Sequence, residues 1–342
     1  MTNLNEFRQD LVSGDWVLFA TGRALRPAPD REVVSKIVPK DKCPFENPEG
    51  HGNKVLETFP ALGGADGPEK LRNGVNWFAK VAQNKFPIVN AANASYGAKT
   101  AGPFSTHAAR GQHELVIFRD HDKQLHQFSV AEMSEVFKIY QQRFGAISKE
   151  DFVKYILIFH NHGARAGASL THPHTQIMSL PLLPPDVEHS ITGAERFYRE
   201  QGKRVYDLMI DWEVKEGRRV VFENDHFIAF CPFVSKSPYE VRIFSKESHA
   251  HFEQLPDDLR NYLAETMLVA LKKINTVLRD PDYNFFIHTA PTGELDVNPH
   301  EFYSWHIEIL PKLGMIGAFE LGSGIDVNSV DPDQAAEELR KA

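Results

Sequence analysis

The chain has 342 residues, of which 42% are hydrophobic and 25% are charged. A chain of this size and composition can bury a sizeable core, has room for two domains or two copies of one unit, and is not generally disordered. The formal net charge is −8, so a phosphate-bearing ligand needs a local basic site. Extended nucleic-acid binding is not expected.

The cysteine count and the lack of targeting segments indicate a compartment. Two cysteines, Cys43 and Cys231, are too few for a disulfide framework. The first residues do not follow the basic-then-apolar order of a secretory signal, and no stretch approaches the length of an apolar membrane span. We therefore expect a cytoplasmic protein with no membrane partner.

In chain order, the first long segment is residues 23–110, which is rich in proline, glycine and asparagine. This composition predicts mainly surface connections. Ser129 and Glu132 form a capping-box pattern, which predicts a helix with an apolar stripe. Strands are predicted on either side of this helix by alternation or by β-branched runs, at residues 113–118, 155–161 and 175–181.

The same order of elements recurs later in the chain. The second set comprises a strand, a helix and two strands, at residues 239–244, 259–278, 283–289 and 305–311. The recurrence predicts an internal duplication. We expect an α+β architecture of two antiparallel sheet-plus-helix halves, residues 1–195 and 196–342, that form one pseudo-twofold body.

The two copies differ in their histidines. Matching the sequences places His306 opposite His172 and Glu308 opposite His174, so only the first copy keeps both histidines. Together with His288, the second pair could form a metal site or salt-linked polar residues. We favour polar residues satisfied by their surroundings.

The stretch His-Pro-His-Thr-Gln in the first copy is a candidate site. Residues two apart on a strand face the same way, so His172, His174 and Gln176 would share one face. The preceding "GARAGAS" lets a substrate approach the backbone closely, and a phosphate there could be held by Ser169 and the Gln176 amide. A neutral His174 could attack an α-phosphate and form a covalent intermediate. A single histidine on a strand is more often structural, but three polar residues in phase favour a site.

A second candidate is the stretch "KCPFE". Cys43 and Glu46 have the spacing of half a zinc site, with a carboxylate where a second thiolate is usual. The alternative is a buried free cysteine near a loop glutamate. A zinc site would need histidines from elsewhere in the chain.

These motifs resemble those of a known family. "FHNHGARAGASLTHPHTQIMSLPLLP" resembles the active-site segment of the galactose-1-phosphate uridylyltransferases, a branch of the histidine-triad superfamily with the signature His-Pro-His-x-Gln. The likeness covers almost the whole chain and includes "GRALRP", "CPFE", "NKFP", "WHIEILP" and "GAFELGSG". Stretches such as "YNFFIHTAP" are similar to relatives that act as ADP-glucose phosphorylases. The resemblance implies two histidine-triad-like halves, the C-terminal one degenerate.

The resemblance also implies roles for single residues. His174 would be the nucleophile and Gln176 would hold the phosphoryl oxygens. Ser169 would also hold the phosphoryl oxygens, and Asn161 would contact the phosphate or ribose region. Arg23 and Arg26 would reach the phosphates of the nucleotide, and Asn84 would lie near its base or ribose. Phe319 and Glu320 would contact the hexose.

The family has two metal sites. The zinc ligands match Cys43, Glu46, His121 and His172, with Glu46 in place of the family's second cysteine. The iron-type site of some members would involve His288 and His306, but Glu308 replaces a histidine there and the family's glutamate aligns near Glu188. We expect a structural zinc and no second metal.

The leading functional hypothesis is a ping-pong nucleotidyltransferase. It would move UMP or AMP between a nucleotide-sugar and a hexose-1-phosphate in galactose and nucleotide-sugar metabolism. The alternatives are an ADP-glucose phosphorylase that uses phosphate as the acceptor, a histidine-triad nucleotide hydrolase, and a non-catalytic nucleotide- or metal-binding module. The family resemblance also implies a homodimer.

Overall fold

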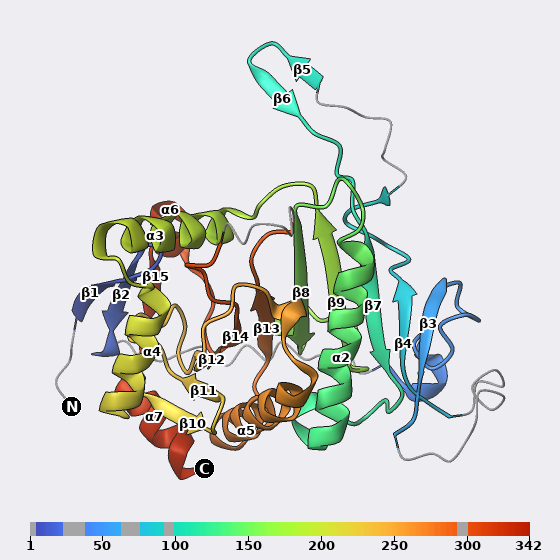
Figure 1. Cartoon of the computed structure of the whole chain (residues 1–342). Coiled ribbons are helices and arrows are strands. Elements are labelled where there is room, and N and C mark those ends of the chain that lie inside the picture. The colour runs from blue at the N-terminus through green and yellow to red at the C-terminus, as the bar shows by residue number, and fades with distance from the viewer. Residues whose placement is uncertain (1–4, 23–37, 63–75, 92–98, 293–299) are drawn as a thin grey trace.

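The computed structural model describes residues 5–22, 38–62, 76–91, 99–292 and 300–342. Its centre is a ten-stranded sheet (Figure 1). Every neighbouring pair of strands in this sheet is antiparallel. From one edge to the other the strands are β10 (Val220–Glu223), β11 (Phe227–Phe230), β12 (Val241–Ser245), β14 (His306–Pro311), β13 (Tyr283–His288), β8 (Tyr155–His162), β9 (His174–Leu180), β7 (His113–Phe118), β4 (Trp77–Gln83) and β3 (Val55–Pro60).

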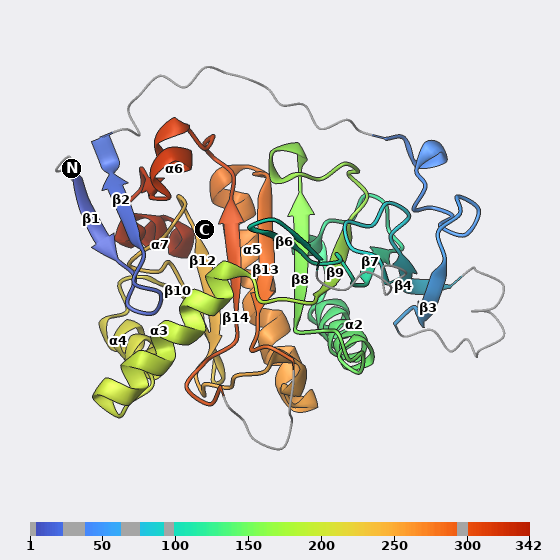
Figure 2. The same ribbon diagram turned by 90° about the horizontal axis from the view of Figure 1, so that it is seen from above.

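The sheet consists of two similar halves that meet where β8 pairs with β13. In each half a helix joins the third strand to the fourth, namely α2 (Val130–Ile147) and α5 (Arg260–Leu278). The two helices lie side by side on one face of the sheet (Figures 1 and 2). The predicted α+β architecture of two sheet-plus-helix halves is therefore confirmed.

Helix α2 begins as its sequence predicts. The Ser129 side chain accepts a hydrogen bond from the Glu132 amide, and the Glu132 carboxylate accepts one from the Ser129 amide. The apolar stripe of the helix, including Val136 and Phe137, is buried against the sheet and α5. The capping box and the 3.6-residue period thus fix both the start and the orientation of the helix.

The strand registers correct the match between the two copies. β9 begins at His174 and β14 begins at His306, and both pair with the end of the third strand of their half. The local hydrogen bonds agree: His174 Nδ1 lies 2.9 Å from the carbonyl oxygen of His172, and His306 Nδ1 lies 3.1 Å from that of Ser304. His306 is therefore the counterpart of His174, not of His172. The predicted match was wrong by two residues, a shift that keeps each side chain on the same face of its strand.

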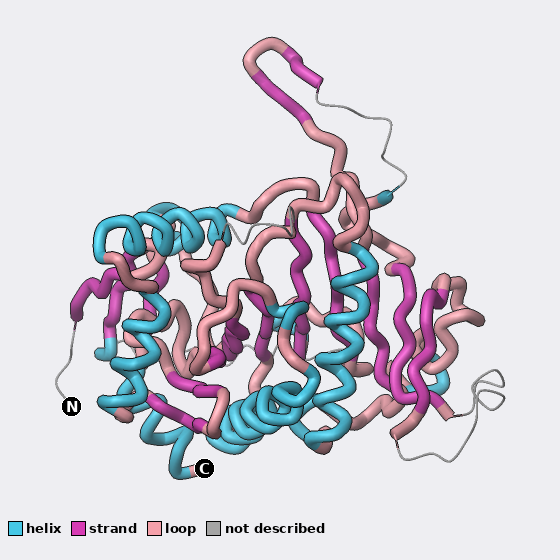
Figure 3. Tube along the Cα trace, in the orientation of Figure 1, coloured by secondary structure: helices cyan, strands magenta, loops and turns pink. Residues whose placement is uncertain are grey.

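The segment predicted to be mainly surface connections also contains strands, because β3 and β4 both lie within it. β4 reads "WFAKVAQ" and is buried along almost its whole length. A strand covered on both faces does not alternate, so the period-two pattern gave no signal. The same segment contributes a hairpin of β5 (Lys99–Ala101) and β6 (Phe104–Thr106), which projects from the body (Figures 1 and 3).

A three-stranded sheet flanks the second half of the main sheet. It consists of β1 (Asn5–Gln9), β2 (Trp16–Ala20) and β15 (Asp326–Asn328). The remaining helices are α3 (Pro185–Gln201), α4 (Val205–Glu216), α6 (Ala318–Ser323) and α7 (Pro332–Lys341). The expected division between residues 195 and 196 falls inside α3 and stays a prediction. Within the described ranges, no helix has both the length and the apolar character needed to cross a membrane.

Candidate functional site

His174 and Gln176 lie on the face of β9 that points away from α2. His174 is 7% exposed, and its Nδ1–H donates to the His172 carbonyl oxygen. In the neutral ring this leaves the lone pair on Nε2 for another partner. Burial lowers the pKa of His174 below its ordinary value, which favours the neutral ring. The imidazole is thus held in the tautomer that a nucleophile requires.

Two rings brace the backbone at His174. His160 on β8 donates from Nδ1 to the His174 carbonyl oxygen at 2.8 Å, and burial lowers the pKa of His160 to about 3. The Phe45 ring contacts the His172 and His174 rings edge-on, with centroids 5.7 and 5.0 Å apart. Both sides of the strand end are therefore fixed before any ligand arrives.

Gln176 is held from the neighbouring strand. His113, the first residue of β7, places its Nε2 2.8 Å from Gln176 Oε1. The Asn84 amide nitrogen lies 3.2 Å from the same ring nitrogen. The structure thus brings Asn84 and Gln176 to one point through His113, which the sequence did not single out.

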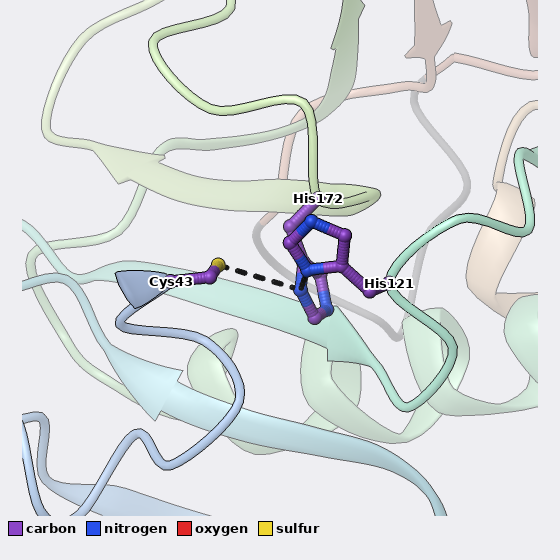
Figure 4. Close-up of side chains that lie close together, drawn as sticks. All are labelled: Cys43, His121 and His172. Carbon is purple, nitrogen blue, oxygen red and sulfur yellow. Dashed lines mark hydrogen bonds between the residues drawn. The ribbon is translucent and has the colours of Figure 1, made fainter. Parts of the chain in front are cut away.

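Four side chains converge beside His174. Cys43 Sγ lies 3.5 Å from His172 Nδ1, and His172 Nδ1 lies 3.1 Å from His121 Nδ1 (Figure 4). Glu46 Oε1 lies 3.2 Å from His121 Nδ1 and 3.7 Å from His172 Nδ1. Cys43, His121 and His172 are all buried. Three of the four predicted zinc ligands, Cys43, His121 and His172, therefore form one possible metal group, and Glu46 lies beside its two histidines.

The donor chemistry of this cluster fits a zinc ion. His172 Nε2–H donates to the Phe118 carbonyl oxygen at 2.7 Å, so the neutral ring turns the lone pair on Nδ1 into the cluster. Burial lowers the pKa of His172 to about 4, which keeps that lone pair free. Glu46 Oε1 is buried and has no hydrogen-bond donor within the described structure. A carboxylate oxygen and two ring nitrogens facing one another are a stable arrangement when a cation lies between them.

The second cluster does not fit a metal ion in the same way. His288, His306 and Glu308 lie close together. However, Arg242 Nε lies 3.1 Å from Glu308 Oε1 and 2.8 Å from Glu240 Oε1, and all three charged side chains are buried. A guanidinium already supplies the positive charge that the carboxylate needs. Burial acts to raise the pKa of Glu308, but Arg242 and the two imidazoles lower it well below its ordinary value.

Replacing Arg242 with methionine should therefore strongly destabilise the protein. It leaves Glu308 and Glu240 buried without their cation, a change that costs about 3–5 kcal/mol of unfolding free energy. Because the pKa of Glu308 is lowered, its stabilisation is present above the ordinary glutamate pKa of about 4.3 and is lost as the pH falls below it. The difference in unfolding free energy between the natural protein and the Arg242→Met variant should therefore become smaller in acid. Urea unfolding at several pH values measures both effects.

The matched control for this prediction is Arg199→Met, which removes an exposed ion pair with Glu195 on α3. Exposed pairs of this kind contribute little to stability, so the urea midpoint should hardly move. Equal losses for the two variants would show that the buried cluster is not a special source of stability.

The other predicted site residues are placed differently. Asn161, on β8, accepts a 2.8 Å hydrogen bond at Oδ1 from Asn284 Nδ2, which also donates to the Ala166 carbonyl oxygen. Ser169 is exposed in the loop before β9. Arg23 and Arg26 lie outside the described residues.

Asn284 links the two halves at the candidate site, because it lies on β13 and orients Asn161 on β8. Replacing Asn284 with leucine should free the Asn161 amide and slow the nucleotidyl transfer predicted from the sequence about tenfold, the value of roughly one buried hydrogen bond. Single-turnover rates measure the effect. An unchanged rate would mean that the orientation of Asn161 does not matter for the reaction.

Phe319 and Glu320 lie on the short helix α6, apart from β9 in both views (Figures 1 and 2). The Glu320 carboxylate accepts a hydrogen bond from the Gly317 amide and caps its own helix. The chain does not bring these two residues to His174.

Sequence patterns had no means of finding His113, Asn284 or Arg242. Each of these residues contacts a side chain on a neighbouring strand. The sequence of a single strand does not determine its pairing register, so such contacts cannot be read from it. His113 is also the first residue of the predicted strand, and a polar residue at that position gives no sign of a function.

Comparisons with known proteins show the family of the chain. Residues 71–184 match the family model of the galactose-1-phosphate uridyl transferase N-terminal domain, and residues 190–341 match that of the C-terminal domain. An ADP-glucose phosphorylase of Arabidopsis thaliana is 32% identical over 98% of this chain and 92% of its own. A galactose-1-phosphate uridylyltransferase of Thermotoga maritima is 28% identical over 98% of each chain.

A solved structure gives the same result. The crystal structure of an ADP-glucose phosphorylase from Arabidopsis thaliana with bound ADP-glucose superimposes with a TM-score of 0.81, at 28% identity and over 99% of each chain.

Proposed function

The chain belongs to the galactose-1-phosphate uridyl transferase family and is a nucleotidyltransferase, and we propose that it works through a covalent intermediate on His174. The observation that carries the proposal is the state of this ring. The ring is buried, which lowers its pKa. Its Nδ1–H donates to the His172 carbonyl oxygen, so Nε2 keeps its lone pair. A histidine in this state is an activated nucleophile.

The reaction would proceed in two displacements. Nε2 of His174 attacks the α-phosphorus of a nucleotide-sugar, the N–P bond forms, and the P–O bond to the sugar-1-phosphate breaks. The ring gains positive charge, which the Nδ1–H bond to the His172 carbonyl stabilises. An acceptor oxygen then attacks phosphorus, the N–P bond breaks, and the neutral ring returns. The Gln176 amide would donate to the phosphoryl oxygens in both steps.

We propose a hexose-1-phosphate as the acceptor and UMP as the group transferred, as in UDP-glucose:hexose-1-phosphate uridylyltransferases. The similarity to ADP-glucose phosphorylases, in sequence and in fold, supports a second candidate in which AMP passes to phosphate. The test is to incubate the protein with UDP-glucose and ADP-glucose, each labelled in the α-phosphate, and then to add glucose-1-phosphate, galactose-1-phosphate or phosphate.

Each outcome of this test is distinct. Label on the protein that passes to hexose-1-phosphate supports the first candidate, and label that passes only to phosphate supports the second. Label released to water alone would make the protein a hydrolase. No label from either donor would overturn the covalent mechanism.

We also propose that Cys43, His121, His172 and Glu46 hold one structural zinc. The ion would brace the loop that carries Phe45 and the strand end that carries His174.

The proposed oligomer is a homodimer in a cytoplasmic setting. The separation of α6 from β9 supports it (Figure 2), because a second copy could bring the α6 residues Phe319 and Glu320 to the site. The projecting hairpin with its exposed Phe104 offers a surface for such a copy. Mixing inactive His174→Ala with inactive Glu320→Ala protein should restore activity if the sites are shared, whereas no recovery would contradict sharing.

A further inference from the structure

His113 is a buried histidine whose ring is fixed from both sides. The Ile88 backbone N–H donates to Nδ1 at 3.3 Å. A neutral ring that accepts at Nδ1 carries its hydrogen on Nε2, and that atom lies 2.8 Å from Gln176 Oε1. The ring therefore donates to the oxygen of the Gln176 amide.

The segment that follows β4 holds this arrangement in place. The Asn84 backbone N–H donates to the His113 carbonyl oxygen at 2.8 Å, and Asn84 Oδ1 accepts from the Phe86 amide at 3.0 Å. The Asn84 amide nitrogen lies 3.2 and 3.4 Å from the two nitrogens of the His113 ring. The Ile88 N–H is thus presented to the ring by a turn that is itself hydrogen-bonded to the strand.

The consequence falls on Gln176. A carboxamide has two orientations that differ by exchange of its oxygen and its NH2 group, and only one of them offers N–H donors to a phosphoryl group. A donor at the oxygen selects the orientation in which the NH2 group points away from His113. Burial lowers the pKa of His113, so the ring stays neutral and keeps its acceptor for Ile88.

We propose that His113 is a positioning residue, which fixes the Gln176 amide with its N–H groups turned toward the phosphoryl group in transfer. The inference rests on the proposed function, in which His174 takes the nucleotidyl group. Because the charge on the phosphoryl oxygens is redistributed during transfer, a misoriented amide should lower kcat more than it raises KM.

The experiment compares His113→Leu with His113→Gln in a single turnover with α-labelled UDP-glucose and ADP-glucose. Leucine removes the donor, and the rate of labelling should fall about tenfold. Glutamine can donate to Gln176 and accept from Ile88, so it should recover most of the rate. The end-point of labelling per folded protein should be the same for both variants.

A double-mutant comparison separates positioning from folding. In a Gln176→Ala background the amide is gone, so adding His113→Leu should cause little further loss of rate. An equal loss in both backgrounds, or normal labelling by His113→Leu, would overturn the positioning role. A loss that follows the fraction of unfolded protein in thermal melts would also overturn it. Absence of label on the wild-type protein would instead overturn the proposed function on which the inference rests.

Discussion

Protein in which His174 is replaced by alanine should take no label from either nucleotide-sugar, and turnover should fall on the order of 10⁴-fold or more. The ring of His174 combines a free lone pair, a neutral state and a fixed tautomer, which together suit attack on phosphorus. His174→Gln keeps a polar side chain but has no comparable nucleophile, so it should be equally inactive. Acid-labile label on the wild-type protein, quantified after rapid quenching, is the measurement.

The duplicated half offers the matched control. His306 occupies the corresponding place on β14 and makes the same hydrogen bond to the residue two before it. Its Nε2 faces Glu308 at 3.4 Å, and Arg242 binds that carboxylate, so the ring is enclosed by an ion cluster. His306→Gln should keep its label per folded protein. Loss of label in this variant, with His174 intact, would mean that the second half takes part in the chemistry.

The contrast between the halves shows what the sequence could reveal about the fold. The duplication, α2 with its capping box, and the strands β7 to β9 followed from periodicity and repeated spacing. β4 did not, because burial on both faces removes the alternation, and the edge strand β3, most of which is not buried, gave no alternation either. The predicted alignment of the second copy was wrong by two residues. The sequence match set His306 and Glu308 opposite His172 and His174, whereas the backbone pairing places His306 opposite His174.

The candidate site divides in the same way. The sequence and the family resemblance pointed to His174, Gln176 and the four residues beside them, and the fold brings these together. His172, His174 and Gln176 lie on or just before one strand, where spacing carries the information, whereas Cys43, Glu46 and His121 come from other segments and were joined to His172 by the resemblance alone. His113, which orients Gln176, sits on the neighbouring strand β7 and acts through a pairing that only the folded sheet specifies.

Purified protein should contain one zinc ion per chain, and Cys43→Ala or His121→Ala should lose it. A structural metal bound at a thousandfold excess over its dissociation constant contributes about 4 kcal/mol, so the unfolding midpoint of a chain of this length should fall by about 6 °C. Labelling should fall as well, because the His172 carbonyl that holds His174 belongs to a metal ligand. Metal analysis, thermal melts and single-turnover labelling on the same samples test this sequence of effects.

Substitutions at Glu46 test whether its carboxylate is a zinc ligand. Its Oε1 faces both imidazoles but comes from a hard carboxylate, whereas zinc favours thiolates. Glu46→Cys should therefore hold zinc longer against a chelator than the natural chain, and Glu46→Ala should release it sooner. Cys231→Ala is the control, since this second buried cysteine lies in the core packed with α5 and should not affect the metal. If the chelator released zinc equally fast from the natural protein, Glu46→Cys and Glu46→Ala, Glu46 would not be a ligand. The brace beside His174 would then consist of Cys43, His121 and His172 alone.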